Sequence, residues 1–411
     1  MLRSQAGIVA VAVAAVFAAC GGYPTVAAID AGGIALGNDA GGKDASPLDA
    51  GGHDASATDA GPLDAGPRDA GALDAGQRDA GDPNVDDGPP PPFTAGTSTL
   101  AGRALPGFVD GTRDVARFSD PVNVAYRDGQ VYVADFDNNR IRVIDATTHE
   151  TSTLIEQSGF ERPFGLAFAP DGTLYLSTDN DPDGGHSQSS GSIWRVAPGG
   201  RSATLVARAI GRPRGLAVLA DGRLAVTDYI HHVVELISPA TGGVTLLAGA
   251  WDQPGFADGD AASARFSAPY GLAVRSDGAL VIADYDNHRI RLVTLDGASS
   301  TLAGGAAGFH DGAIAGALFR NPQGLAIADN GDLFVSELGN NRIRRIGGGS
   351  VATVAGNGIA GYLDHDDPLA SQLYGLEGLA VVPDGSMLYV ADGGRGEQVP
   401  FNRIRQVARH W

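Results

Sequence analysis

A repeating unit accounts for most of this sequence. Its clearest copy is PYGLAVRSDGALVIADYDNHRIRLV at residues 269–293. Related segments begin at residues 121, 163, 213, 322 and 376, so the six copies start 42, 50, 56, 53 and 54 residues apart. Such self-similarity is the signature of repeat architectures, in which each unit needs neighbours to bury its hydrophobic surface. We therefore expect a single array of small, similar units.

Each unit contains four short segments that read as strands. In the copy at 269–293 the apolar run GLAV is followed by Asp-Gly, a strong signal for a hairpin. The runs LVIAD, RIRLV and TLAG then follow in order along the chain. No helical period competes with them. Four antiparallel strands repeated six times predict an all-β fold, a six-bladed β-propeller.

The fourth strand is missing from the last unit but present before the first. The final copy ends at RIRQV (403–407) with no TLAG segment after it, whereas STLAG stands at 98–102. We predict that an N-terminal strand at 97–102 completes the last blade. This arrangement would remove two exposed sheet edges.

The repeated motif resembles a known family. The pattern P-x-G-L-A, then D-G-x-L-x-V-A-D, then N-x-R-I-R recurs through 97–411 and is similar to the NHL repeat. The resemblance implies a six-bladed propeller. It implies no single activity, because propellers of this kind include binding platforms, RNA-binding proteins, lyases, lactonases and quinone-dependent dehydrogenases.

The N-terminal residues predict export and lipidation. An apolar run at 7–19 reads as the core of a signal peptide spanning 1–19. Small residues precede Cys20, the one cysteine of the chain, and FAAC (17–20) resembles the lipobox of bacterial lipoproteins. The resemblance implies lipid attachment at Cys20, with Gly21 favouring the outer membrane of a Gram-negative cell. The alternative is an ordinary signal peptide followed by a chance cysteine.

Residues 20–93 read as a disordered linker rich in Asp, Ala, Gly and Pro. Aspartate recurs every five residues from 39 to 79, and large apolar residues are nearly absent, so this segment cannot offset the entropy of ordering. The propeller is predicted to occupy 94–411. The whole chain has a formal net charge of −19 at pH 7, which disfavours nucleic acid as a partner.

An acidic residue ends the second predicted strand of every unit: Asp135, Asp179, Asp228, Asp284, Glu337 and Asp392. Such a ring could attract a cation, or each acid could accept hydrogen bonds from the following loop. We expect four of them to pair with the first arginine of the next strand, namely Arg140, Arg289, Arg342 and Arg403. The aligned positions in units 2 and 3 are Ser192 and Val233, so Asp179 and Asp228 are expected to lack a fixed counter-charge.

Units 2 and 3 therefore hold the candidate ligand residues, which are Asp179, Asp228, His186, His231 and His232. The segment D-x-D-x-D-G at 179–184 also resembles the start of a calcium loop, with Asp179, Asp181 and Asp183 as candidate ligands. The alternative is a solvated insertion rich in turn residues. Calcium is the one cofactor that the sequence suggests, and no residue is assigned a catalytic role.

The functional hypothesis is a lipoprotein anchored in the cell envelope that displays the propeller as a non-enzymatic binding platform. Its partner would be a protein, peptide or glycan, and the membrane would be contacted through the lipid at Cys20. One alternative is a metal-dependent enzyme of the gluconolactonase-like or amidating-lyase-like type. Another is a structural spacer. An enzyme would require its acids and histidines to converge on one cavity near the axis.

Overall fold

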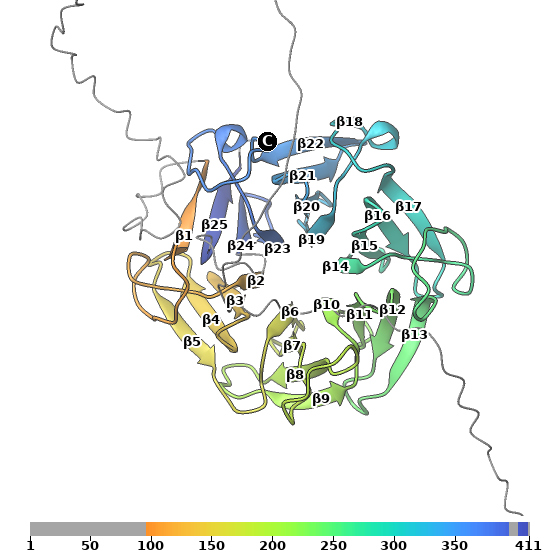
Figure 1. Cartoon of the computed structure of the whole chain (residues 1–411), viewed down its shortest axis with the longest axis horizontal. Helices are drawn as coiled ribbons and strands as arrows, with labels where there is room; N and C mark the ends of the chain where they lie inside the picture. The colour runs from red at the N-terminus through yellow and green to blue at the C-terminus, as the bar shows by residue number, and fades with distance from the viewer. Residues whose placement is uncertain (1–95, 394–401, 410–411) are drawn as a thin grey trace, which may run out of the picture. The chain divides into compact units, whose positions relative to one another are not determined.

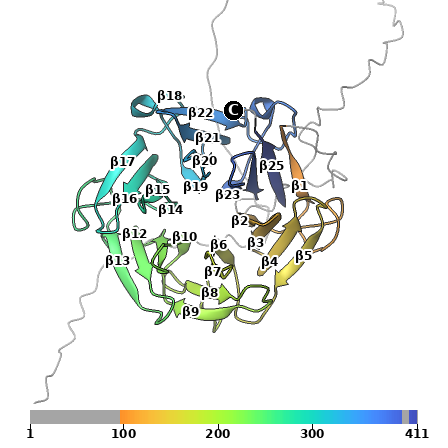
Figure 2. The ribbon, with the colours of Figure 1, turned by 180° about the vertical axis from the view of Figure 1, so that it is seen from behind.

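The computed structural model describes residues 96–393 and 402–409. In this part of the chain, strands form six sheets arranged as blades around a central axis (Figure 1), and the view from behind shows the same ring (Figure 2). The predicted six-bladed propeller is confirmed. Across the described residues, no helix has the length and apolar character needed to cross a bilayer. The predicted signal peptide and linker at 1–93 lie outside the described residues.

The blades are antiparallel sheets whose first strand lies nearest the axis, except that blade 6 takes its outermost strand from the N-terminal side of the domain. Blades 1 to 3 are β2 (Pro121–Arg127), β3 (Gln130–Asp135), β4 (Arg140–Asp145) and β5 (Thr151–Ile155); β6 (Pro163–Phe168), β7 (Leu174–Thr178), β8 (Ser192–Val196) and β9 (Thr204–Arg208); and β10 (Pro213–Val218), β11 (Leu224–Asp228), β12 (Val233–Ile237) and β13 (Val244–Gly249).

Blades 4 to 6 are β14 (Pro269–Val274), β15 (Leu280–Asp284), β16 (Arg289–Val293) and β17 (Ser299–Gly304); β19 (Pro322–Ile327), β20 (Leu333–Glu337), β21 (Arg342–Gly347) and β22 (Ser350–Ala355); and β23 (Leu376–Val381), β24 (Met387–Asp392), β25 (Asn402–Ala408) and β1 (Thr97–Arg103). A two-residue strand, β18 (Gly312–Ala313), adds to blade 5, and two single-turn 3₁₀ helices are η1 (Ile314–Gly316) and η2 (Pro368–Ala370).

Strand β1 closes the ring as predicted. It pairs antiparallel with β25 from Thr97 opposite Val407 to Arg103 opposite Asn402, and the two strands lie side by side in Figure 1. Leu100 in this strand is fully buried. Strands from the two ends of the domain therefore share one sheet, and blade 6 has four strands, as blades 1 to 4 have.

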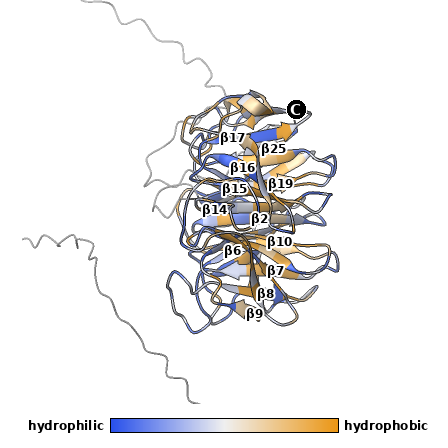
Figure 3. Ribbon diagram, turned by 90° about the vertical axis from the view of Figure 1, so that its right-hand side faces the viewer, coloured by the Kyte–Doolittle hydropathy of each residue, from blue (hydrophilic) through white to orange (hydrophobic). Residues whose placement is uncertain are grey.

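Six clusters of buried apolar residues lie between neighbouring blades. In the cluster between blades 6 and 1, for example, Leu100 and Ile404 pack with Phe118 and Val133. Figure 3 shows hydrophobic residues in the strands of every blade it labels, mixed with hydrophilic ones. All five residues of β15 are buried, and successive side chains point to opposite faces of a strand, so a blade contributes to the clusters on both of its sides. The cluster between blades 2 and 3 has the fewest buried members, with seven residues from Ile193 to Ile237.

Blades 1, 4, 5 and 6 each contain a buried arginine that pairs with two acids. In blade 1, Arg142 Nη1 donates to Asp135 Oδ2 at 2.8 Å, and its Nη2 donates to Asp110 Oδ1 at 2.6 Å. The equivalent arginines in the other three blades are Arg291, Arg344 and Arg405, and all four are fully buried. The prediction that the first arginine of the strand pairs with the acid is therefore wrong by two residues.

The direction of the two arginine side chains explains this difference. Arg140 lies directly opposite Asp135 in the sheet, but its guanidinium turns outward and stacks over the Phe108 ring at 3.8 Å. The side chain of Arg142 is long enough to cross diagonally to Asp135. Arg289, Arg342 and Arg403 stack in the same way as Arg140, on Phe256, Phe309 and Tyr362.

The linkers that enter these four blades supply the second acid. Asp110 also accepts hydrogen bonds from the backbone nitrogen and hydroxyl of Thr153 on the outermost strand, at 3.1 and 3.2 Å. Asp258, Asp311 and Asp364 repeat this role with Thr301, Thr353 and Thr99. These aspartates lie in GFxDG sequences at 107–111, 255–259 and 308–312, and in the divergent GYLDH at 361–365. Each forms a structural clamp that joins linker, third strand and fourth strand. We call this arrangement the arginine clamp.

Candidate functional site at the channel mouth

Asp179 stands outside the ring of acids that the sequence suggests. In blade 2 the residue opposite the first proline of the inner strand is Thr178, where the other blades have an acid. The indole nitrogen of Trp194 donates to the Thr178 hydroxyl at 2.9 Å, so a neutral pair replaces the arginine and acid. Strand β7 ends at Thr178, the register position that Asp228 holds in β11, so Asp179 lies one residue beyond the strand, at the mouth of the central channel.

Asp179 has a strong cationic partner there. Arg214, from the inner strand of blade 3, donates from Nη1 to Asp179 Oδ1 at 2.5 Å and from Nη2 to Oδ2 at 3.1 Å. Burial disfavours the charged form of Arg214, but Asp179, with smaller contributions from Tyr270 and Glu377, outweighs burial and raises the pKa of Arg214. The expectation that Asp179 lacks a counter-charge is therefore wrong. The sequence alignment missed this partner because it comes from the next blade.

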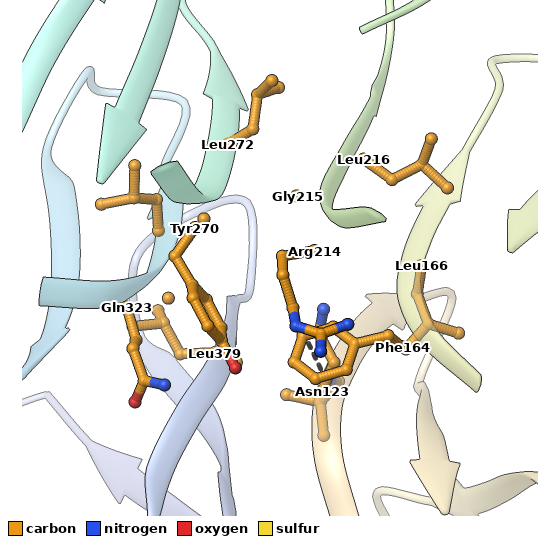
Figure 4. Close-up of a pocket in the computed structure, with 15 residues that line it drawn as sticks. Asn123, Phe164, Leu166, Arg214, Gly215, Leu216, Tyr270, Leu272, Gln323 and Leu379 are labelled. Carbon is orange, nitrogen blue, oxygen red and sulfur yellow. Dashed lines mark hydrogen bonds between the residues drawn. The ribbon is translucent and has the colours of Figure 1, made fainter. Parts of the chain in front are cut away.

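Inner-strand residues of several blades line a pocket at this mouth (Figure 4). The pocket encloses about 450 Å³ of space that no protein atom fills, part of it open to solvent. Its polar and aromatic lining comes from Asn123, Phe164, Arg214, Tyr270 and Gln323. In the view of Figure 4, Arg214 lies beside Phe164, and Tyr270 and Gln323 lie to their left.

Aromatic rings form one wall of the mouth. The Arg214 guanidinium lies 4.2 Å from the centre of the Phe164 ring. Tyr270 makes edge contacts with both Phe164 and Tyr229, each with ring centres 5.6 Å apart. Such rings offer flat apolar faces next to polar tips.

Tyr270 also connects this wall to an acid on blade 6. Its hydroxyl donates to Glu377 Oε2 at 3.1 Å. Burial, together with the neighbouring Glu377 carboxylate, raises the pKa of Tyr270. The hydroxyl therefore stays protonated and retains a lone pair that can accept a hydrogen bond.

Gln323 is the unsatisfied polar group of the pocket. Its side chain is 3% exposed, yet Oε1 has no hydrogen-bond partner among the described residues. A buried amide oxygen without a partner costs roughly 1–3 kcal/mol, and in native proteins such a group calls for a specific explanation. A ligand or water that donates to Gln323 would remove this cost.

His186 lies on the same face as the mouth but is held by arginines. Its Nε2 is 2.9 Å from Arg162 Nη1 and 3.0 Å from Arg212 Nη2. Partial burial and the two guanidinium groups lower the pKa of His186. A neutral imidazole that accepts at Nε2 fits both contacts. Arg212 Nη1 is also 3.8 Å from Asp179 Oδ2, so His186 borders the Asp179 network.

Asp228 and His231 form a separate pair in blade 3. His231 Nδ1 lies 2.5 Å from Asp228 Oδ2, and Trp251 stacks on the imidazole with ring centres 4.4 Å apart. Asp228 therefore has another of the predicted site residues, His231, as its side-chain partner. Glu235 takes the place of the clamp arginine here, and burial, with a contribution from Asp228, raises the pKa of Glu235 to about 8.

His232 has a structural position. It adopts a left-handed backbone conformation with φ of 61°, and its Nδ1 accepts from the Ala268 backbone nitrogen at 3.0 Å. Asn139 and His288 hold equivalent positions and accept from the Arg162 and Asn321 nitrogens of the next blade. His232 therefore links blades 3 and 4.

The proposed calcium ligands face arginines in this structure. Arg208 Nη1 is 3.9 Å from Asp181 Oδ1 and 3.4 Å from Asp183 Oδ2, while Asp179 contacts Arg214. Within 96–393 and 402–409, no three His, Cys, Asp or Glu side chains gather in a way that could hold a metal ion. The calcium site stays a prediction.

The channel residues Phe164, Arg214, Tyr270, Gln323 and Glu377 were not among the predicted site residues. All five are the second residue of their inner strand, at the variable x of the P-x-G-L-A motif or its equivalent. In a propeller this position repeats around the axis. The signal was therefore present in the sequence as variation at one position of an otherwise constant motif.

Comparison with known proteins agrees with the fold. Residues 118–144 and 319–346 match the NHL repeat family. Protein SUPPRESSOR OF QUENCHING 1, chloroplastic, from Arabidopsis thaliana is 30% identical over 278 residues, which cover 58% of this chain and 26% of that protein. NHL repeat-containing protein 2 from Homo sapiens is 24% identical over 293 residues, covering 58% of this chain and 40% of that protein. The chain thus spans well under half the length of these relatives.

Solved structures show the same architecture. A protein of unknown function from Bacteroides thetaiotaomicron aligns with a TM-score of 0.61 at 18% identity, covering 76% of this chain and 75% of its own. An auxiliary nutrient binding protein from the same organism aligns with a TM-score of 0.61 at 17% identity, covering 76% of each chain. At these identities the likeness concerns the fold alone. The matched repeats, the relatives and the six blades together support an NHL-repeat β-propeller.

Proposed function

We propose that this protein is a non-enzymatic binding platform of the cell envelope that holds the end of a glycan or peptide in the channel mouth. The observation that carries the proposal is the Gln323 side chain, which is buried in the pocket with an unpartnered Oε1. It stands among aromatic rings and paired charges, so the mouth is already arranged to receive a polar group.

The charges of the mouth favour a neutral ligand group. Arg214 is paired with Asp179, and Tyr270 donates to Glu377. The group left to recognise is an amide, which binds hydroxyls and other amides without a net charge. The Phe164 and Tyr270 rings would pack against the apolar face of a sugar ring or a side chain. A sugar or a peptide end has both features.

The cellular setting rests on the sequence. A signal peptide at 1–19, lipid at Cys20 and a linker at 20–93 would hold the propeller at the membrane, in the outer membrane of a Gram-negative cell. More than one acyl chain would anchor it stably. Mass spectrometry of the purified protein tests this directly, since diacyl or triacyl mass on an N-terminal Cys20 is expected and an unmodified Cys20 would contradict it.

The enzyme alternative has one supporting feature, the buried Asp228–His231 pair, since a carboxylate that orients an imidazole is common in general-base catalysis. Its other requirement was a cavity shared by Asp179, Asp228 and two histidines. His186 instead contacts Arg162 and Arg212. The platform is therefore the function we favour.

Binding can be tested with the full chain on arrays of neutral oligosaccharides and short peptides, followed by calorimetric titration of each hit. We expect Gln323→Leu to weaken the binding of a true ligand at least about tenfold, because one buried hydrogen bond worth about 1.4 kcal/mol is lost. Gln188→Leu, which changes an exposed glutamine of the same face, is the matched control. Hits that respond equally to both substitutions would refute the proposed site.

A further inference from the structure

The outer edges of the blades differ in a way that the channel does not explain. In blades 1, 4, 5 and 6 a segment of the chain lies along the outermost strand as a short fifth strand. Gly111 and Thr151, for example, exchange two backbone hydrogen bonds of 2.9 and 2.7 Å. Equivalent bridges cover Ser299, Val351 and Thr97.

Blade 2 has a substitute for this cover. The side-chain amide of Gln157 accepts from the Ala203 nitrogen at 2.8 Å and donates to the Ala203 oxygen at 2.9 Å. It thereby satisfies the same two backbone groups that a linker residue satisfies in the four clamped blades, a glycine in blades 1, 4 and 5 and His365 in blade 6. Five of the six edges are thus occupied at this position by the chain itself.

Blade 3 has no such cover among the described residues. Val244 occupies the position of Thr151 in the register and is 38% exposed, whereas Thr151 is 1% exposed. Leu246, at the position of the clamp threonine, is 54% exposed, and Trp251 nearby is also exposed. The strand reads VTLLAG, with no charged residue and no proline.

Such an edge is unusual because natural edge strands are shielded by charges, proline, bulges or covering segments to prevent unwanted pairing. An apolar strand with free outward backbone groups can pair with an added strand. The other blades show within one molecule what this addition looks like, namely an extended segment bonded at the position of Val244.

Beside this edge, blade 3 has an acidic residue where the clamped blades have the buried arginine. Glu235 lies directly opposite Leu246 and holds the place of the clamp arginine. It is buried, and its Oε2 has no partner among the described residues. In the clamped blades an incoming aspartate meets an arginine. In blade 3 an incoming aspartate would meet a second carboxyl group, that of Glu235, in place of the arginine, with Asp228 close by.

We infer that the outer edge of β13 is a docking surface for an extended, basic segment of another protein, which adds as a fifth strand and places an arginine or lysine against Glu235. The basic residue would reproduce the ion pair of the arginine clamp with the two charges exchanged. The net charge of −19 for the chain favours a basic partner as well. This surface is independent of the channel mouth.

The test uses the full chain and two synthetic peptides. Both copy residues 306–314, the linker that forms β18 on blade 5, and in one of them the aspartate is changed as in Asp311→Arg. Backbone hydrogen exchange is measured at Val244 and Leu246 with and without each peptide. We expect the arginine peptide to slow exchange at both amides several-fold and the unchanged peptide to have little effect.

Two variants sharpen the result. Val244→Pro removes one outward donor and should abolish the protection by the arginine peptide. Glu235→Gln should reduce the preference for the arginine peptide while the fold is kept, so the test survives if the proline variant fails to fold. Equal protection by both peptides, or none at any concentration, would overturn the proposal.

Exchange without peptide provides a further outcome. If Val244 and Leu246 are already protected in dilute protein, a segment of the chain itself covers the edge. If protection grows with protein concentration, a second copy does so. Either result would replace the basic partner that we infer.

Discussion

Blades 1, 4, 5 and 6 differ from blades 2 and 3 in how their charges are used. Each blade of the first group buries one arginine between two acids, and the linker that enters the blade bonds to its outermost strand. The second group replaces that arginine with Trp194 and Glu235, and its acids and cations turn to other partners. The regular blades therefore use the repeat motif for stability, whereas the irregular blades place Asp179 and Arg214 at the channel mouth. Departures from the repeat point to the candidate site.

The largest effect is expected from removal of the closing strand. Deletion of Thr97–Arg103 would leave blade 6 with three strands and would also remove Thr99, whose nitrogen donates to Asp364 at 2.9 Å. Blade 6 would then lose its arginine clamp. We expect the melting temperature in calorimetry to fall by on the order of 10 °C. Deletion of residues 64–70 is a control of equal length, and an equal melting temperature in the two proteins would contradict the closure.

A smaller but still large loss is expected when one clamp is broken. Arg291→Met would leave the buried Asp284 without its cation, and loss of one partner of a buried ion pair costs about 3–5 kcal/mol. Arg289→Met in the same strand removes the stacking on Phe256 and one hydrogen bond to the Asn287 carbonyl oxygen, and should cost about 1 kcal/mol. Urea unfolding measures both. Similar losses would mean that the buried pair contributes no more than the surface contact.

The third effect depends on pH and concerns blade 3. Glu235 has a pKa of about 8 in the folded protein, above its ordinary value, because of burial and then Asp228. Between the two values the folded state holds a proton that the unfolded state has released, so stability falls as pH rises through this window and levels off above pH 8. The slope is about 1.4 kcal/mol per pH unit.

Glu235→Gln should remove this loss of stability with rising pH. Asp135 and Asp284 also have pKa values raised to about 6 by burial despite their arginines, but both remain in the variant. The difference in the free energy of unfolding between the two proteins from pH 6 to 8 thus isolates Glu235. Over that range the stability of the variant should rise by roughly 2–3 kcal/mol relative to that of the unchanged protein. Parallel stability curves would show that Glu235 titrates in its ordinary range.

The fold could be predicted because its signals are local and repeated six times. Hairpin dipeptides, alternating apolar residues and the displaced STLAG segment each specify strands and their order. The sequence could not show whether Thr178 or Asp179 ends strand β7, because the two residues are adjacent. Only the pairing of Thr178 with Pro163 in the structure distinguishes them. Contacts between blades were also out of reach, as with Arg214 and Asp179, because the partners are 35 residues apart and belong to different units.

The sequence analysis placed the candidate site on blades 2 and 3, whereas the channel pocket takes its lining from the inner strands of all six blades. His232 and Asp228 were chosen for their chemistry, yet their geometry gives them structural partners. Arg214, Tyr270 and Gln323 carry no catalytic or metal-binding motif, so nothing but their shared position in the repeat marks them. In a propeller, the variable position of the inner strand is thus a better guide to the axis than residue type.

The most direct test of the channel site is the side-chain amide of Gln323. Its NH₂ signals can be assigned in a ¹H–¹⁵N spectrum of the full chain by comparison with Gln323→Leu, and followed while a ligand from the arrays is added. Our account predicts that the Gln323 signals shift on binding, whereas those of Gln157, whose amide is already bonded to Ala203, stay in place. Saturable binding that leaves the Gln323 signals unchanged would contradict it.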